Sequence, residues 1–482
     1  MNEIDRVMRL MAPRSVAIVG ASGDANKTAG RPIAYLRKHG FSGAIFPVNP
    51  RLSDIDGLPC YASIEALKNA GVVPDVALIL LNAERSISAV AELSALGCSA
   101  AIVLASGFSE TGDAGTERQQ ALAKAAGPMR LLGPNTIGLV NLTQGIVLSA
   151  SGALEMDHFP VGSIAVISQS GGILGSLLSR AAARGIGLSK LISTSNEVDL
   201  EIADFIEYLI DDPHTKVIAL YIESVRNPIK FRAAALKAAR AGKPIVAFKI
   251  GRSESGAQAA ASHTGALAGS DRMYDAFFAQ LGIIRAQTFS DLLDIPCALT
   301  VGRTLKGKRV AILTSTGGAG TLVSDSLGVA GFEMPAPDEP TAARLRALQQ
   351  GDEAALDRNP IDVTLAGLQP DLLRGAIAAL LESTCYDALI IVVGSSALAM
   401  PELMAGAIED CLGLSDKPVM AFVSPHAPHV AVILNGRGVP AFANPESCAG
   451  ALLGMQHAAN LSALSAHCGN QLESLSEAFL NT

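Results

Sequence analysis

One histidine stands in a setting that suits covalent chemistry. His263 lies between a serine and a threonine in SHTGALAG (262–269), where no bulky side chain is available to bury the imidazole. A neutral imidazole is a competent nucleophile near pH 7, and it can carry a phosphoryl group if a carboxylate holds its tautomer. Glu223, which ends the apolar run VIALYIE, is the candidate carboxylate. A capping or solvent-exposed histidine is the alternative.

A serine- and glycine-rich turn lies earlier in the chain. Ser168 to Gly172 (SQSGG) follows a β-branched run and opens a stretch of small and apolar residues. Such a turn can bind a phosphate at a helix N-terminus, or it can present Ser170 as the nucleophile of a hydrolase. The hydrolase would need a histidine and an acid beside Ser170, and the sequence does not place them. Both interpretations stay open at this level.

A second glycine turn, GASG (20–23), follows the first β-branched run and also suits phosphate binding. A nicotinamide site would show GxGxxG here and an acidic residue after the next strand, whereas this chain has GASG and then PVNPR. Lys27 and Arg51 would instead bring two cations to the phosphates of a nucleotide such as coenzyme A, or they are solvated loop charges. In GPNTIG (133–138), the amide of Asn135 can point into a cleft or belong to a purely structural turn.

Three other patterns carry less weight. GRTLKGKR (302–309) is close to a Walker A loop, but Arg309 stands where Ser or Thr would bind magnesium, and the strand follows the motif. His426 and His429 accompany two prolines without acidic neighbours, and the seven cysteines show no CxxC or paired His/Cys spacing. We therefore expect neither a metal site nor a disulfide framework.

The elements that must position these residues repeat three times along the chain. Each repeat is a β-branched run, a Gly/Ser-rich turn and an amphipathic stretch, with the runs at 16–19, 164–167 and 310–314. Strands that alternate with helices in this way predict parallel sheets with right-handed crossovers. We expect an α/β protein of three consecutive doubly wound parallel-sheet domains, at 1–145, 146–302 and 303–482.

Composition narrows the class of protein. The net charge is −8 and no Lys/Arg-rich stretch is present, which argues against nucleic acid as a partner. The apolar runs are far shorter than the roughly 18 residues that a membrane span needs, and no long apolar segment follows the N-terminal charges. A soluble cytoplasmic protein is the expectation.

Taken together, the motifs resemble those of a known family. The chain is similar over nearly its whole length to the α-subunit of ADP-forming acetyl-CoA synthetases, which are relatives of succinyl-CoA synthetase. Nine segments occur in the family's order: VAIVGASGDANKTAGRP, PVNPR, LASGFSETG, GPNTIGLVN, ISQSGGILG, TKVIALYIES, AASHTGALAGSD, VAILTSTGGAGTLVSD and NPIDVT. The resemblance implies a Rossmann-like CoA-binding domain followed by two flavodoxin-like domains of the succinyl-CoA-synthetase type.

The resemblance also implies three sets of site residues. His263 is the residue that is phosphorylated, and Glu223 orients it. The phosphate is held by a set from the second turn: Ser168, Ser170, Gly171 and Gly172. Coenzyme A is held around its phosphates and adenosine by Gly20, Ala21, Ser22, Gly23, Lys27, Asn49, Pro50 and Arg51, and near its thiol by Ser106, Gly107 and Asn135.

The implied activity is an acid-thiol ligase that interconverts acyl-CoA, ADP and phosphate with a carboxylate, CoA and ATP through an acyl phosphate and a phosphohistidine. ATP, ADP and Mg²⁺ belong to an ATP-grasp β-subunit in this family, so the resemblance implies such a partner and a hetero-oligomer.

Two departures lie where the acyl specificity could be altered, so the acid is not named. Thr136 stands where many relatives have cysteine, and TSNEVD (194–199) replaces a GN-containing form. A non-catalytic CoA-binding regulator of the same fold is the main alternative, and an NAD-dependent oxidoreductase or a Ser170 hydrolase is weaker.

Overall fold

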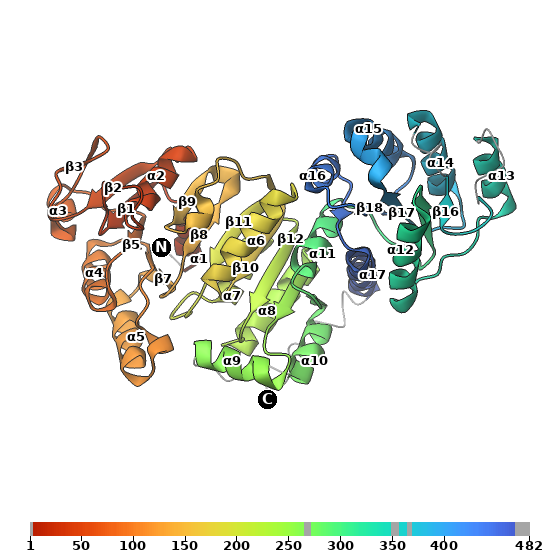
Figure 1. Cartoon of the computed structure of the whole chain (residues 1–482). Helices are drawn as coiled ribbons and strands as arrows, with labels where there is room; N and C mark the ends of the chain where they lie inside the picture. Colours follow the sequence, from red (N-terminus) through yellow and green to blue (C-terminus); the bar gives the residue numbers. More distant parts are fainter. Residues whose placement is uncertain (1–2, 265–270, 349–355, 364–368, 468–482) are drawn as a thin grey trace. The chain divides into compact units, whose positions relative to one another are not determined.

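The computed structural model describes residues 3–264, 271–348, 356–363 and 369–467. It is an α/β structure whose three main sheets are mostly parallel and are flanked by helices (Figure 1). By contacts the chain divides into two compact units. Unit 1 comprises 1–180 and 187–285, and unit 2 comprises 181–186 and 286–482.

The first sheet is parallel throughout. Its strands, in spatial order, are β2 (Ala44–Val48), β1 (Ser15–Val19), β5 (Val76–Ile79), β6 (Ala100–Val103) and β7 (Arg130–Leu132). The helices of this part of the chain are α1 (Glu3–Met11), α2 (Arg31–Lys38), α3 (Ile64–Asn69), α4 (Ala83–Leu96) and α5 (Asp113–Ala126). A short hairpin of β3 (Asp54–Ile55) and β4 (Leu58–Pro59) follows β2.

The central strands are unbroken runs of apolar residues because both faces of the sheet are buried. In β1, Val16 and Ile18 belong to one hydrophobic core, while Ala17 and Val19 belong to the other. Side chains alternate across a strand, so each face needs its own layer of helices. Residues at its two ends define helix α4. Asn82 accepts a hydrogen bond from Arg85 N (3.0 Å) where the helix begins, and Gly97 (φ 94°) ends it.

The second sheet also belongs to unit 1. Its spatial order is β14 (Ile284–Arg285), β13 (Ile245–Lys249), β12 (Val217–Ile222), β10 (Val161–Ser168), β11 (Leu188–Ser193), β8 (Gly138–Asn141) and β9 (Ile146–Ser149). The helices of this region are α6 (Gly171–Ala183), α7 (Ile202–Ile210), α8 (Pro228–Arg240), α9 (Glu254–Thr264) and α10 (Asp271–Leu281). Strands β8 and β9 pair antiparallel, and β8 also pairs antiparallel with β11.

The β8–β9 hairpin departs from the purely parallel sheet that the sequence predicts. It turns through η2 (Leu142–Gln144) and Gly145, whose φ of 65° suits a tight reversal. A short reversal of this kind can join only antiparallel strands, because a parallel pair needs a long crossover. The hairpin spans residue 145 and pairs with the second sheet, while the divisions at 145 and 302 stay predictions.

The third sheet lies in unit 2. Its strands are, in spatial order, β16 (Ile361–Asp362), β15 (Val310–Thr314), β17 (Ala388–Val393), β18 (Val419–Val423) and β19 (Ala441–Phe442), all parallel. The helices of this part are α11 (Asp291–Thr300), α12 (Gly317–Val329), α13 (Glu339–Ala347), α14 (Pro370–Glu382), α15 (Pro401–Cys411), α16 (Pro428–Gly436) and α17 (Pro445–His467).

All three sheets share one topology. If the parallel strands of each sheet are numbered along the chain, their spatial order is 2-1-3-4-5 every time, which is the doubly wound, flavodoxin-like order. Ligands of such sheets bind outside the carboxyl ends of the strands, where the first and third strands lie side by side. In unit 1 these places are the ends of β1 and β5 and the ends of β10 and β12. The predicted α/β fold class is confirmed.

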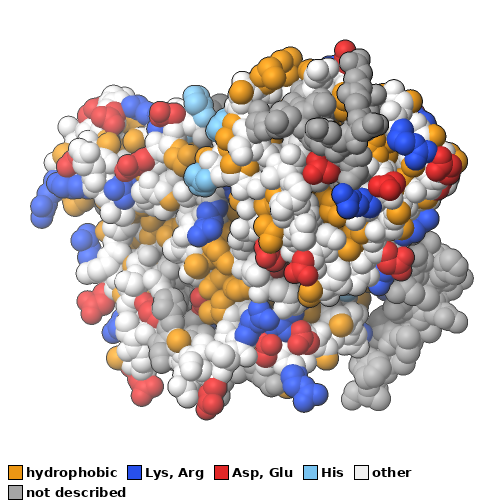
Figure 2. Space-filling model, turned by 45° about the vertical axis from the view of Figure 1, so that its right-hand side comes forward, with side chains coloured by type: hydrophobic (Ala, Val, Ile, Leu, Met, Phe, Trp, Pro, Cys, Tyr) orange, Lys and Arg blue, Asp and Glu red, His pale blue; other side chains and the backbone are white. Residues whose placement is uncertain are grey.

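The exterior carries both kinds of charge. Figure 2 shows Lys/Arg and Asp/Glu side chains interspersed on one face, without a large region of a single sign. Among the helices that the structure describes, none is long and apolar enough to cross a membrane.

Candidate functional site

The turn after β1 brings the predicted CoA-phosphate residues together. Gly20 has a φ of 87°, and a Cβ added there would lie 2.9 Å from the carbonyl oxygen of Leu80. Only glycine therefore lets the chain pass this close to the next strand. Asn49 Nδ2 donates to Ala21 O (2.7 Å), and Arg51 N donates to Asn49 Oδ1 (2.8 Å). Asn49 thus joins GASG to NPR at the carboxyl edge of the first sheet.

The two predicted cations of this turn lie at its surface. Lys27 and Arg51 are exposed, as are Gly23 and Pro50, and a Cβ at Gly23 would meet open space. Lys27 Nζ lies 3.6 Å from a carboxylate oxygen of Asp24, an exposed pair that costs little to open. The turn therefore combines close main-chain approach with two accessible cations, which fits the phosphates of coenzyme A.

The residues predicted near the thiol form a second loop at the same edge. Asn135 has a φ of 60°, and its N–H donates to Ala105 O (2.8 Å), which places it beside Ser106. Gly107 N donates to Glu110 Oε1 (2.5 Å). Although partial burial acts to raise the pKa of Glu110, hydrogen bonds from Asn196 and from the main chain at Gly107 hold it below its usual value. The loop is thus built around an ionised carboxylate.

The turn at Ser168–Gly172 is organised by its own first serine. Ser168 is buried, its Oγ donates to Ser170 O (2.7 Å), and the same Oγ accepts from Ser170 N (3.1 Å). The helix α6 then begins at Gly171, and a Cβ at Gly172 would meet open space. Ser168 therefore shapes the turn, whereas Gly172 lies exposed at the helix N-terminus, where an anion is favoured.

The third sheet repeats this turn. Thr314 Oγ1 donates to Thr316 O (3.0 Å) and accepts from Thr316 N (2.9 Å), and α12 begins at Gly317. The shared sequence pattern is a hydroxyl residue, any residue, a hydroxyl residue and two glycines. The sequence predicts this unit as a strand and turn, but it indicates no function for the two hydroxyl groups.

Gln169, which the sequence analysis left without a function, links the second turn to the predicted carboxylate. Its Oε1 accepts from Glu223 N (2.7 Å) and Ser224 N (3.0 Å), and its Nε2 donates to Ser224 O (2.8 Å). Glu223 is 7% exposed and follows the last residue of β12. The phosphate turn and Glu223 are therefore held together by one side-chain amide.

His263 lies in the last turn of α9, where the backbone but not the side chain belongs to the described residues. This helix contacts η1 (Ser109–Thr111), which follows the loop of Ser106 and Gly107. The structure thus brings the histidine's helix beside the predicted thiol-end loop, within unit 1. The segment 265–270 that continues the SHTG motif lies outside the described residues.

The segment after β11, residues 194–199, connects the loop of Ser106 and Gly107 with the turn at Ser168–Gly172. Asn196 Nδ2 donates to Glu110 Oε2 (2.6 Å), and its N–H donates to Pro134 O (3.3 Å) in the GPNTIG turn. Its neighbour Glu197 accepts from Gln169 Nε2 (2.9 Å). One short turn therefore contacts the predicted thiol-end residue Asn135 through Asn196, and Gln169, inside the turn of the predicted phosphate residues, through Glu197.

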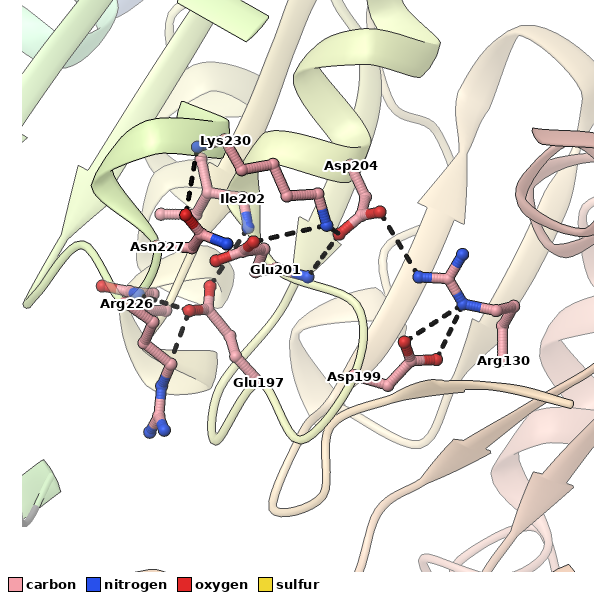
Figure 3. Close-up of polar contacts among 10 residues, drawn as sticks. Arg130, Glu197, Asp199, Glu201, Ile202, Asp204, Arg226, Asn227 and Lys230 are labelled. Carbon is pink, nitrogen blue, oxygen red and sulfur yellow. Dashed lines mark hydrogen bonds and ion pairs between the residues drawn. The ribbon is translucent and has the colours of Figure 1, made fainter. Parts of the chain in front are cut away.

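Figure 3 shows the charged side chains around this turn. Arg130 Nε lies 2.9 Å from Asp199 and its Nη2 lies 3.3 Å from Asp204, while Lys230 Nζ lies 2.7 Å from Asp204. Arg226 Nε lies 3.7 Å from a carboxylate oxygen of Glu197. The only sequence signal for this network was the departure noted at TSNEVD, since its partners come from distant segments.

Two further residues have defined surroundings. The hydroxyl of Thr136 donates to Ser193 O (2.6 Å) and accepts from Gly138 N (2.9 Å), so it fastens the GPNTIG turn to β11. Lys249, at the end of β13, is buried with its ammonium 4.6 Å from the ring centre of Tyr274, and burial lowers its pKa. Among the described residues, no group of three or more His, Cys, Asp or Glu side chains is placed to hold a metal ion.

Comparison with known proteins identifies two family models along the chain. Residues 14–141 match a CoA binding domain, and residues 161–299 match a succinyl-CoA ligase like flavodoxin domain. The first covers the turn after β1 and the loop at Asn135. The second covers the turn at Ser168, Glu223 and His263.

Curated relatives fall into two length classes. The chain is 33% identical over 450 residues to the α subunit of ADP-forming acetate–CoA ligase II from Pyrococcus furiosus, covering 91% of this chain and 95% of that subunit. It is 35% identical over 352 residues to ADP-forming acetate–CoA ligase from Methanocaldococcus jannaschii, covering 73% of this chain but 48% of that protein. The chain therefore spans almost all of the first relative and about half the length of the second.

The fold also has a solved counterpart. The structure of dinucleotide-forming acetyl-coenzyme A synthetase 1 from Ca. Korarchaeum cryptofilum, in complex with phosphate and ADP, superimposes with a TM-score of 0.84 at 30% identity. The match covers 94% of this chain and 97% of that one.

Proposed function

The chain belongs to the family of ADP-forming acetate–CoA ligase α subunits, and from this premise we propose that it is the CoA-binding, histidine-phosphorylated half of an ADP-forming acyl-CoA synthetase. The observation that carries the proposal is the Gln169 bridge, which holds the phosphate turn against Glu223 inside the unit that also contains the CoA turn.

Each step of the proposed cycle exchanges one bond for another. A phosphate oxygen attacks the acyl carbonyl of acyl-CoA, the C–S bond breaks, and CoA leaves as the thiolate. A ring nitrogen of His263 then attacks the phosphorus of the acyl phosphate, and the P–O bond to the acyl group breaks to release the carboxylate. An oxygen of the terminal ADP phosphate attacks the phosphohistidine, the N–P bond breaks, and ATP forms. Synthesis of acyl-CoA runs the same steps in reverse.

The chain's own residues would divide this work by location. The main chain at Gly20–Gly23, with Lys27 and Arg51, would hold the nucleotide end of CoA, and Asn135 with the Ser106–Gly107 loop would face its thiol. The main-chain N–H groups at Ser170–Gly172 would bind the phosphate at the positive end of α6. Glu223 would hold the imidazole of His263 in the nucleophilic tautomer.

We propose that ADP binds outside this chain. We propose that an ATP-grasp β subunit supplies the ATP/ADP and Mg²⁺ site and that the active species is a hetero-oligomer, because the relative that this chain matches end to end is named as an α subunit. Since ATP and CoA are cytoplasmic metabolites, we place the enzyme in the cytoplasm. The carboxylic acid is left open.

Transfer of label from ATP tests the proposal. The chain is incubated with its β subunit, [γ-³²P]ATP and Mg²⁺, and compared with His263→Ala and with the matched control His214→Ala, which removes an exposed loop histidine. We expect acid-labile, base-stable label on the wild type and the control and none on His263→Ala. Absence of label on the wild type with an active β subunit would overturn the synthetase and favour a CoA-binding regulator.

A further inference from the structure

The side-chain amide of Gln169 has all its hydrogen-bonding groups in use. Its oxygen accepts two main-chain N–H groups, from Glu223 at 2.7 Å and Ser224 at 3.0 Å, and its nitrogen donates to Ser224 O (2.8 Å) and Glu197 Oε2 (2.9 Å). Two donors face the oxygen and two acceptors face the nitrogen, so only one orientation of the amide satisfies them all. Gln169 thus fixes the main chain that carries the Glu223 carboxylate.

Glu197 fixes that orientation from the other side. It is 6% exposed, its Oε1 accepts from Ile202 N (3.2 Å), and its Oε2 accepts from Gln169. Because Oε2 of Glu197 accepts this hydrogen bond, it selects the nitrogen end of the neighbouring amide. A hydrogen-bond donor in the place of Glu197 Oε2 would face the Gln169 nitrogen, which is also a donor, and would disfavour this orientation of the Gln169 amide.

The backbone is strained where Glu197 lies. Ser195 and Glu197 have φ values of 53° and 52°, a left-handed conformation that non-glycine residues rarely adopt. Such conformations are energetically unfavourable and persist where the surroundings hold them, often at functional sites. Here the strain directs Asn196 toward the Glu110 loop and Glu197 toward Gln169.

We propose that Glu197, acting through Gln169, is a positioning residue that sets the location of the Glu223 carboxylate for phosphoryl transfer. The proposal rests on the proposed function, in which Glu223 holds His263. Neither Gln169 nor Glu197 touches the reacting atoms in this assignment, and both act through the main chain at 223–224.

A reciprocal exchange tests the pair. Glu197→Gln has one amide oxygen for two donors, so its nitrogen must face either the Gln169 nitrogen or the Ile202 N–H. Gln169→Glu places two carboxyl groups in contact. Each single variant should therefore slow labelling of His263 from ATP by about tenfold or more. The double variant restores one donor facing one acceptor and should be faster than either single variant. Recovery is partial, because a glutamate at 169 cannot donate to Ser224 O.

Controls separate positioning from general damage. Glu207→Gln makes the same chemical change on the outer side of α7 and should leave the labelling rate unchanged. CoA affinity, measured by calorimetry, should stay within about twofold of wild type in every variant, since the residues assigned to the nucleotide end of CoA (Gly20–Gly23, Lys27 and Arg51) follow strands of the first sheet. If Glu197→Gln does not fold, Glu197→Asp keeps the charge but withdraws the oxygens by one methylene and should also slow labelling.

The outcomes are distinct. An unlabelled wild type refutes the proposed function itself. A labelled wild type with Glu197→Gln labelled at the same rate overturns the positioning assignment alone. The positioning assignment is also overturned if CoA binding is lost together with labelling. A double variant that is labelled more slowly than both single variants overturns it too, because neither result fits a pair that acts on Glu223.

Discussion

Burial of Glu197 makes the stability of this protein depend on pH in a defined direction. Burial raises the pKa of Glu197 from 4.5 to about 7, while hydrogen bonds from Thr194 and Gln169 and the charge of Arg226 oppose the shift. A carboxyl whose pKa is higher in the folded state binds protons preferentially there, so the free energy of unfolding falls as pH rises from about 4.5 through about 7. At about 1.4 kcal/mol per pKa unit, the loss is roughly 3 kcal/mol.

Glu197→Gln isolates this contribution, because glutamine does not titrate. The stability of wild type relative to the variant should be greatest below about pH 4.5 and should fall by roughly 3 kcal/mol by pH 8. Urea unfolding followed by far-UV circular dichroism measures the difference, since the chain has no tryptophan for fluorescence. Glu207→Gln should keep the wild-type pH dependence. If the difference in unfolding free energy between wild type and Glu197→Gln stays constant from pH 5 to pH 8, the reasoning is refuted.

Three further substitutions probe the scaffold. Gly20→Ala should weaken CoA binding at least tenfold in calorimetry and lower the unfolding free energy by about 1–2 kcal/mol. The reason is that φ is 87° and the new Cβ would lie 2.9 Å from a carbonyl oxygen. Unchanged affinity would contradict the assignment of this turn to CoA. Arg130→Met should cost about 1.5–3 kcal/mol in urea unfolding, since Asp199 loses Arg130 whereas Asp204 keeps Lys230, and a loss below about 1 kcal/mol would show that the carboxylates are solvated. Ser195→Gly should raise stability by up to about 1 kcal/mol by relieving a left-handed residue, and a decrease would assign the larger contribution to the hydroxyl contact with Ser193.

Much of the fold was readable from local pattern. The three β-branched runs form the first strands β1, β10 and β15, because strands buried on both faces must be apolar along their whole length. The turns after these runs could be identified from their glycines, and at Gly20 the close approach of Leu80 O requires one. The family resemblance was confirmed by a relative that matches 91% of this chain, while the individual site residues stay predictions.

Other features depend on how distant segments meet. The antiparallel β8–β9 hairpin was not predicted, because a pair of short apolar runs does not state which sheet it will join. Glu110, Asn196 and Glu197 were missed as well. Each is an ordinary polar residue in sequence, and each acquires its function from partners 28 to 86 residues away.

The sequence by itself determined the strands, the glycine turns and the histidine motif, since these depend on side-chain size, backbone freedom and hydrophobic periodicity within a few residues. The tertiary structure decided which carboxylate and which amide meet. Gln169, Glu197 and Glu223 follow three different strands, and Gln169 contacts the other two because parallel strands end at the same edge of the sheet. Hydrogen-bond partners of this kind are set by strand order and register, which no local pattern encodes.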